Sequence, residues 1–167
     1  MKIGLLSDTH SFLDDRLLKH FTACDELWHA GDMGDVEVLD RLEAFRPTLA
    51  VYGNIDGADI QVRAPLNLDF EREGVRVFMT HIGGYPGRYT ARVRAELEER
   101  RPRLYICGHS HILKVVNDPK RGLLHINPGA CGRHGFHQVR TAVRFDLREG
   151  RIENLEVIEL GKRASLT

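Results

Sequence analysis

The chain has 167 residues, of which 42% are hydrophobic and 29% are charged, as in soluble globular proteins. This length predicts a single domain over residues 1–167 that can bury a core without disulfides or a structural metal. Lysine plus arginine equals aspartate plus glutamate at 24 each, so the formal net charge is zero. That balance excludes an electrostatic basis for nonspecific binding to nucleic acid or membranes.

The location of the protein is predicted from its termini, apolar runs and cysteines. No apolar run approaches the roughly 18 residues of a membrane helix, and residues 1–8 are typical of a first strand rather than a signal peptide. Three cysteines without a Cys-x-x-Cys pair are typical of free thiols in a reducing compartment. We therefore expect a cytoplasmic protein with no membrane partner.

The first part of the chain predicts alternating strands and helices. Short apolar runs predict strands over residues 2–7, 26–30 and 48–53. Apolar residues at helical spacing predict helices over residues 13–21 and 38–45, and Ser11 with Asp14 resembles a capping box before the first. Residues 57–65 predict a loop or a frayed turn between the third strand and the next element.

The second part predicts a hairpin, one helix and further strands. The hairpin covers residues 66–70 and 75–80, the helix covers 90–100 with Thr90 as its cap, and a strand covers 103–107. Antiparallel strands are predicted over residues 112–117, 122–127, 138–146 and 151–160. Because these are too many strands for one sheet in so short a chain, we expect two packed sheets with helices outside.

Five predicted strands end beside side chains that can bind a metal. These side chains are Asp8, His10, Asp32, Asn54, His81, His109 and His111. We expect them to meet, because ligands bind where the carboxyl ends of strands converge in an open α/β sheet. Carboxylate, amide and imidazole groups suit manganese, iron, zinc, nickel or cobalt, and seven of them suit two ions. The absence of thiolates disfavours a structural zinc site.

The order of these blocks resembles the calcineurin-like metallophosphoesterase superfamily. The blocks are Asp-x-His at 8–10, Gly-Asp-x-x-Asp at 31–35, Gly-Asn-x-Asp at 53–56, His81, and Gly-His-x-His at 108–111. The short chain and Asn127-Pro128-Gly129 look like its small YfcE-type phosphodiesterase branch. The resemblance covers residues 1 to about 130. It implies an α/β (α+β) fold, a four-layer αββα sandwich of two mixed β-sheets flanked by helices.

The resemblance also implies a ligand set and a reaction. Asp8, His10, Asp32 and His111 would hold one divalent ion, and Asp32, Asn54, His81 and His109 the other. We expect manganese first, with iron, zinc, nickel or cobalt as alternatives. Two such ions lower the pKa of a bridging water, and Asp32, Asn54 and His81 would act in catalysis through the resulting metal-bound hydroxide. The expected activity is hydrolysis of small phosphate esters, diesters ahead of monoesters.

Five further residues have two interpretations each. Asp35 could support a ligand or cap the helix that follows, and Asp56 could brace a metal-bound histidine or hold its turn. His29 could orient a ligand or simply occupy its strand. Arg88 could grip a phosphate or lie on the surface, and Asn127 could line the site or form a turn. We do not expect His20, His125, His134 or His137 to be ligands.

A departure from the family at Ile55 keeps a second function open, and another, at residues 82–89, implies a specificity that is local to this loop. Ile55 stands where many superfamily enzymes carry a histidine that helps the leaving group depart, and residues 82–89 replace a Gly-His pair. The alternative is a non-catalytic or weakly active interaction scaffold, as in the branch that serves a membrane-trafficking coat. Seven competent ligand positions favour an enzyme. Nucleic acid larger than a nucleotide-sized substrate is not expected, and a homo-oligomer is left open.

Overall fold

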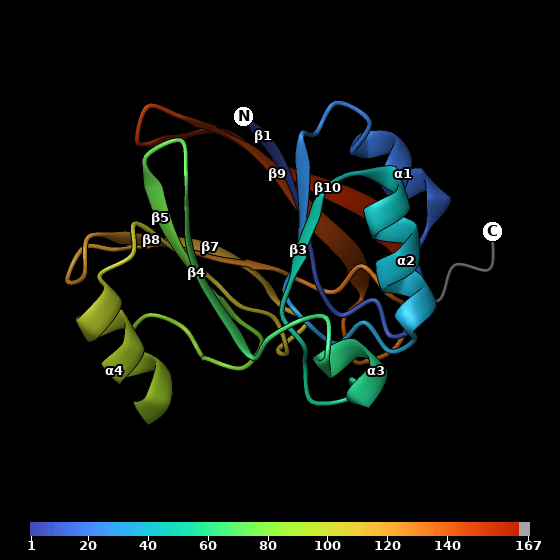
Figure 1. Cartoon of the computed structure of the whole chain (residues 1–167), viewed down its shortest axis with the longest axis horizontal. Coiled ribbons are helices and arrows are strands. Elements are labelled where there is room, and N and C mark those ends of the chain that lie inside the picture. Colours follow the sequence, from blue (N-terminus) through green and yellow to red (C-terminus); the bar gives the residue numbers. More distant parts are fainter. Residues whose placement is uncertain (164–167) are drawn as a thin grey trace.

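Two five-stranded β-sheets form the centre of the computed structural model, which describes residues 1–163 (Figure 1). The first contains β1 (Lys2–Leu6), β2 (Glu26–His29), β3 (Thr48–Ala50), β9 (Val139–Arg148) and β10 (Arg151–Lys162). The second contains β4 (Asn67–Arg72), β5 (Val75–Thr80), β6 (Leu104–Ile106), β7 (Leu113–Asp118) and β8 (Leu123–Pro128). The expectation of two packed sheets is confirmed.

Both sheets mix parallel and antiparallel pairs. Their strand orders are β10-β9-β1-β2-β3 and β4-β5-β6-β8-β7. β1, β2 and β3 run parallel, as do β5, β6 and β8. The carboxyl ends of the parallel strands therefore gather within each sheet, which is where the metal-ligand candidates follow in sequence.

Helices on the two outer faces complete four layers (Figure 1). α1 (Asp15–His20) and α2 (Val36–Phe45) cover the first sheet, α4 (Ala91–Arg100) covers the second, and α3 (Ala58–Gln61) is a short helix after β3. Among residues 1–163, none of these helices is long and apolar enough to span a bilayer.

The buried side chains form three layers that match this arrangement. Leu17 and Leu42 pack on the outer face of the first sheet, and Val93 and Leu97 pack on that of the second. A third layer fills the space between the sheets and contains Trp28, whose ring meets that of Phe145 edge to face at 5.7 Å. The inner strands β1, β2, β5, β6 and β8 are thus largely buried on both faces, which explains their nearly continuous apolar sequences.

Three local predictions were wrong. Asp14, not Ser11, is the N-cap of α1, because its carboxylate accepts a hydrogen bond from Arg16 N. Residues 58–61 form α3 instead of a loop, because Gly57 O accepts from the backbone N–H groups of the first turn. β3 ends at Ala50, before the predicted end at residue 53, because its pairing with β2 ends there and the backbone N–H of Tyr52 donates to Pro65 O.

Candidate metal centre

Six of the seven predicted ligands meet in two groups at the carboxyl ends of the strands. Asp8 with His10 and His111, and Asp32 with His81 and His109, offer ligand atoms within 4.8 Å of one another. The turns after β1 and β2 bring the aspartates, and the turns after β5 and β6 bring most of the histidines. The grouping parallels the two ligand sets inferred from the sequence.

The two aspartates lie between the histidines. Asp8 Oδ1 is 3.2 Å from His111 Nε2. Asp32 Oδ1 is 3.2 Å from His81 Nε2, whereas its Oδ2 is 3.7 Å from His10 Nε2. Asp32 therefore turns one oxygen toward each group, which is the arrangement that a bridging carboxylate requires.

The donor atoms fit divalent cations. Within residues 1–163, the buried atoms Asp8 Oδ1 and His81 Nε2 have no hydrogen bond of normal geometry. His81 Nδ1 donates to Ala30 O at 2.7 Å, so the lone pair of Nε2 points toward the carboxylates. Burial alone would lower the pKa of His81, but Asp32 and Asp8 raise it above its usual value. The two carboxylates thus favour a positive charge beside His81 Nε2, and a bound metal ion would supply that charge.

The turns that carry these side chains have an uncommon backbone conformation. Asp8, His10, Asp32, His109 and His111 all have positive φ angles, between 46° and 67°. Residues other than glycine seldom adopt this region, which is unfavourable by about 1–2 kcal/mol per residue. Such strain persists where the surrounding structure enforces it and is concentrated at functional sites. The five turn residues are therefore held in place by the fold.

His29 supports the turns from beneath, without reaching the ligand atoms. Its Nδ1 accepts from Gly31 N at 3.1 Å, so its Nε2 donates to Thr9 Oγ1, also at 3.1 Å. Thr9 Oγ1 in turn donates to Met33 O at 3.0 Å. Burial lowers the pKa of His29 to about 3, so the ring is neutral at physiological pH. This network ties the turn after β1 to the turn after β2.

Asp56 and Asn127 hold further turns of the site. The Asp56 carboxylate is 4% exposed and accepts from Gly34 N at 2.8 Å and Gly53 N at 2.7 Å. It therefore connects the turn that follows Asp32 to the turn that carries Asn54. Asn127 Nδ2 donates to Gly108 O at 2.8 Å, which fixes the turn before His109. Both residues support the ligand-bearing backbone and do not reach the ligand atoms themselves.

Two predicted residues are not brought to the cluster. Asp35 is exposed at the N-cap of α2, where its side chain makes no capping hydrogen bond. Arg88 is exposed in the loop before α4. Neither lines the hollow into which the cluster opens. The surface interpretation of Arg88 and the cap position of Asp35 agree with the structure, although Asp35 does not hydrogen-bond as a cap.

The cluster opens into a hollow of about 450 Å³. Asn54 and Ile55 line it together with the residue 134–137 segment. The His134 ring lies 4.9 Å from the His10 ring, and the His137 ring lies 5.3 Å from the His111 ring, between centroids. Apart from the glycine-rich surroundings of residues 134–137, no sequence pattern predicts their place at this hollow.

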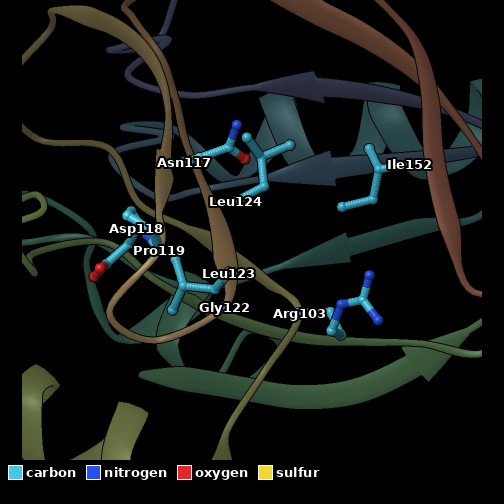
Figure 2. A pocket seen from close by; sticks show the side chains of 8 residues that line it. All are labelled: Arg103, Asn117, Asp118, Pro119, Gly122, Leu123, Leu124 and Ile152. Carbon is cyan, nitrogen blue, oxygen red and sulfur yellow. The ribbon is translucent and has the colours of Figure 1, made fainter.

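A separate hollow of about 420 Å³ lies toward the opposite ends of the strands (Figure 2). Arg103 directly precedes β6, Leu124 begins β8 with its neighbour Leu123, and Ile152 is near the start of β10. The strands β6 and β8 therefore separate this hollow from the metal-ligand candidates, which follow their other ends. It is not part of the candidate centre.

A comparison with models of protein families shows to which superfamily the chain belongs. A family model described as the calcineurin-like phosphoesterase superfamily domain matches residues 1–150. The chain belongs to this superfamily. The match spans every ligand-bearing turn described above, and divalent metal ions are the cofactors that membership implies.

Archaeal relatives of the superfamily are similar over most of their length. A protein of Methanothermobacter thermautotrophicus named "Probable metallophosphoesterase" is 30% identical over 137 residues, which cover 78% of this chain and 77% of that one. A phosphodiesterase of Methanocaldococcus jannaschii is 26% identical over 149 residues, which cover 78% and 84%.

Solved structures of an archaeal phosphodiesterase and of Vps29 proteins share the fold. An archaeal phosphodiesterase superposes with a TM-score of 0.76 at 24% identity, covering 96% of this chain and 100% of that one. Vps29 of Chaetomium thermophilum gives 0.76 at 15% identity, covering 98% and 99%. Zinc-bound Vps29 of Entamoeba histolytica gives 0.73 at 14% identity, covering 95% and 99%. The expected αββα sandwich is confirmed.

Proposed function

We propose that this metal-dependent phosphoesterase is a phosphodiesterase with two divalent ions, acting on small phosphate esters. The observation that carries the proposal is the placement of Asp32, whose two carboxylate oxygens face two different histidine groups. With a single ion, one of the two histidine groups would have no cation to bind. The phosphodiesterase named among the relatives supports the choice of diesters.

The seven predicted side chains divide between the two ions. Asp8, His10, Asp32 and His111 hold one ion, and Asp32, Asn54, His81 and His109 hold the other. When bound, the pair supplies Lewis-acid polarisation of phosphoryl oxygens and a water of lowered pKa. We propose manganese first, with iron, zinc, nickel or cobalt as alternatives, because mixed oxygen and nitrogen donors suit all of them.

The protein's own residues bind and orient rather than attack. Burial raises the pKa of the Cys107 and Cys131 thiols to about 12, so neither is a suitable nucleophile. Ala30 O holds the His81 ring in one orientation, and Asn54 lines the hollow where an ester would enter. Ile55, which is 44% exposed in the same hollow, offers no proton, so leaving groups of low basicity are favoured.

Metal reconstitution tests the proposal. Metal-stripped protein is loaded with Mn²⁺ and assayed on bis-p-nitrophenyl phosphate and p-nitrophenyl phosphate, and its metal content is measured. We expect about two ions per chain and faster hydrolysis of the diester. Asp32→Asn should abolish turnover and lower metal content, whereas Asp35→Asn, a change at an exposed carboxylate three residues away, should behave as wild type. Normal activity in Asp32→Asn would disprove the bridging role.

An interaction scaffold is the second candidate. Apolar side chains surround the mouth of the centre, with Ile112 62% exposed and Ile82, Tyr85 and Phe136 also exposed. The shared fold with Vps29 proteins is compatible with a protein partner at this rim. Inactivity toward both esters with every divalent ion, despite two bound ions per chain, would favour the scaffold.

A further inference from the structure

We propose that a small hollow beside the metal centre is a subsite for an anionic substituent, a carboxylate or a second phosphate, on the ester that the enzyme hydrolyses. The inference rests on the proposed function. The hollow measures about 140 Å³ and lies beneath residues 82–85. His109 and Ser110 line both this hollow and that of the metal centre, so a substituent of a bound ester can extend from one to the other.

His125 forms part of the floor and lacks a partner. Its side chain is 1% exposed, and within residues 1–163 its Nδ1 has no hydrogen bond. A buried ring nitrogen without a partner is unfavourable, and because His125 lines the hollow, its ring favours a hydrogen-bonding ligand there. Burial lowers the pKa of His125 to about 4, so the ring is neutral at physiological pH and retains one N–H group to donate.

Lys114 brings a positive charge to the same hollow. Its Nζ lies 4.0 Å from the centroid of the Tyr85 ring, which belongs to the loop above. None of the carboxylates in the described part of the chain forms an ion pair with it. Asp118, the carboxylate that influences His125, is already bonded to Tyr89 and Arg121. Among residues 1–163, the ammonium group of Lys114 therefore has no counter-ion.

Ser110 completes the donor set. Its Oγ accepts hydrogen bonds from Asn127 Nδ2 at 3.0 Å and from Ile112 N at 3.3 Å. Because both accepted bonds occupy the lone pairs of the oxygen, the hydroxyl proton is available to a ligand.

The donor set determines the class of ligand. The ammonium of Lys114, the imidazole N–H of His125 and the hydroxyl of Ser110 are three donors, and none of the residues that line the hollow carries a carboxylate. Donors with one net positive charge bind an oxygen anion. The volume of about 140 Å³ corresponds to roughly five water molecules at about 30 Å³ each, which admits a carboxylate or a phosphate but not a nucleobase with its sugar.

Matched esters test the subsite. We would compare p-nitrophenyl diesters that share the leaving group and carry a propyl, 2-carboxyethyl or 2-phosphonoethyl group as the second ester. Wild-type enzyme should hydrolyse one of the two acidic esters with kcat/KM at least tenfold above that of the propyl ester, mainly through a lower KM. The better of the two identifies the anion. Equal kcat/KM for all three would overturn the proposal.

Lysine variants distinguish a preference for acidic esters that is due to the subsite from one that is due to the attraction of the two metal ions for anions. Lys114→Met should remove the preference for the acidic esters over the propyl ester, and Lys114→Arg should keep it. Lys120→Met, at an exposed lysine in the β7–β8 turn, should leave all three rates unchanged. A preference that survives Lys114→Met would show that the metal ions alone select the anion, which would also overturn the proposal.

A binding measurement distinguishes failure of the subsite from failure of the proposed function. Absence of hydrolysis of all three esters with every divalent ion would contradict the phosphodiesterase. The imidazole NMR signals of His125 in zinc-loaded protein would then be followed during titration with 3-hydroxypropionate and with inorganic phosphate. A shift with either anion that Lys114→Met abolishes supports the anion site by itself. No shift with either anion disproves it.

Discussion

Gly53 and Asp32 approach so closely that a β-carbon on Gly53 would lie 2.1 Å from Asp32 Oδ1. Gly53 is thus required for space rather than for an unusual backbone conformation. Its neighbour Asn54 can enter the site only because the chain passes directly against the Asp32 carboxylate.

Gly53→Ala should therefore displace Asp32 and weaken metal binding. We expect at least a tenfold loss of kcat/KM and a decrease of about 1–3 kcal/mol in the free energy of unfolding. Metal titration and urea unfolding measure the two effects. Gly57→Ala is the control, because a β-carbon there would meet only Asp59 Oδ1 at 3.0 Å and φ is −77°. Similar losses in both variants would contradict the steric explanation.

Asp56→Asn should loosen the turns that carry Asp32 and Asn54. The amide that replaces one carboxylate oxygen faces a backbone N–H group, so one of the two hydrogen bonds to Gly34 N and Gly53 N is lost. We expect a decrease of about 2–3 kcal/mol in the free energy of unfolding of metal-free protein. Urea unfolding checks this value, with Asp35→Asn as the control at an exposed carboxylate. An unchanged midpoint would show that Asp56 has no structural role.

His125 should make the protein sensitive to mild acid. Its pKa is about 4 in the folded protein and about 6.5 when unfolded, so the unfolded state binds more protons between these values. The stabilising contribution of the neutral ring is complete above pH 6.5 and is lost as pH falls toward 4. The loss should be on the order of 3 kcal/mol. Urea unfolding of metal-free protein from pH 7 to 4 measures it, and the slope should flatten in His125→Leu. Parallel curves would contradict the assignment.

Ile55→His should increase monoesterase activity. The side chain is 44% exposed in the hollow of the centre, so an imidazole fits without disturbing the core. General-acid catalysis typically contributes about 10²–10⁴-fold, and we expect a gain of at least tenfold on p-nitrophenyl phosphate, with a bell-shaped pH profile. Ile55→Gln, which is polar but does not titrate, serves as the control. Equal rates in both variants would show that proton donation is not limiting.

The grouping of the candidate ligands could be predicted from the sequence because each candidate follows a strong strand signal. Asp8, Asp32 and His81 stand directly after apolar runs, and parallel strands place such residues at one edge whatever the details of the loops. The two-sheet sandwich could be predicted for a similar reason, since many short strands in a small chain cannot form one sheet.

His29, Asp56 and Asn127 could be named from the sequence as candidate supporting residues, but the choice between their alternative roles could not be made, because those roles depend on contacts between distant segments. In the sequence, Lys114 and His125 are typical residues of a β-hairpin. They line a hollow only because residues 82–85 lie against them in the folded chain. The cap of α1 was misplaced for a comparable reason. Asp14 accepts a hydrogen bond from Arg140, a residue 126 positions away, and that bond favours Asp14 over Ser11.

The predicted ligands are divided between the two sheets. Asp8, His10, Asp32 and Asn54 follow strands of the first sheet, and His81, His109 and His111 follow strands of the second. Ions held by both sets cross-link the sheets at one edge, so metal affinity and the free energy of unfolding are thermodynamically linked. Substitution of Trp28, deep between the sheets, should consequently change metal affinity without altering any ligand, and the metal supply during growth should set the melting temperature of the purified protein.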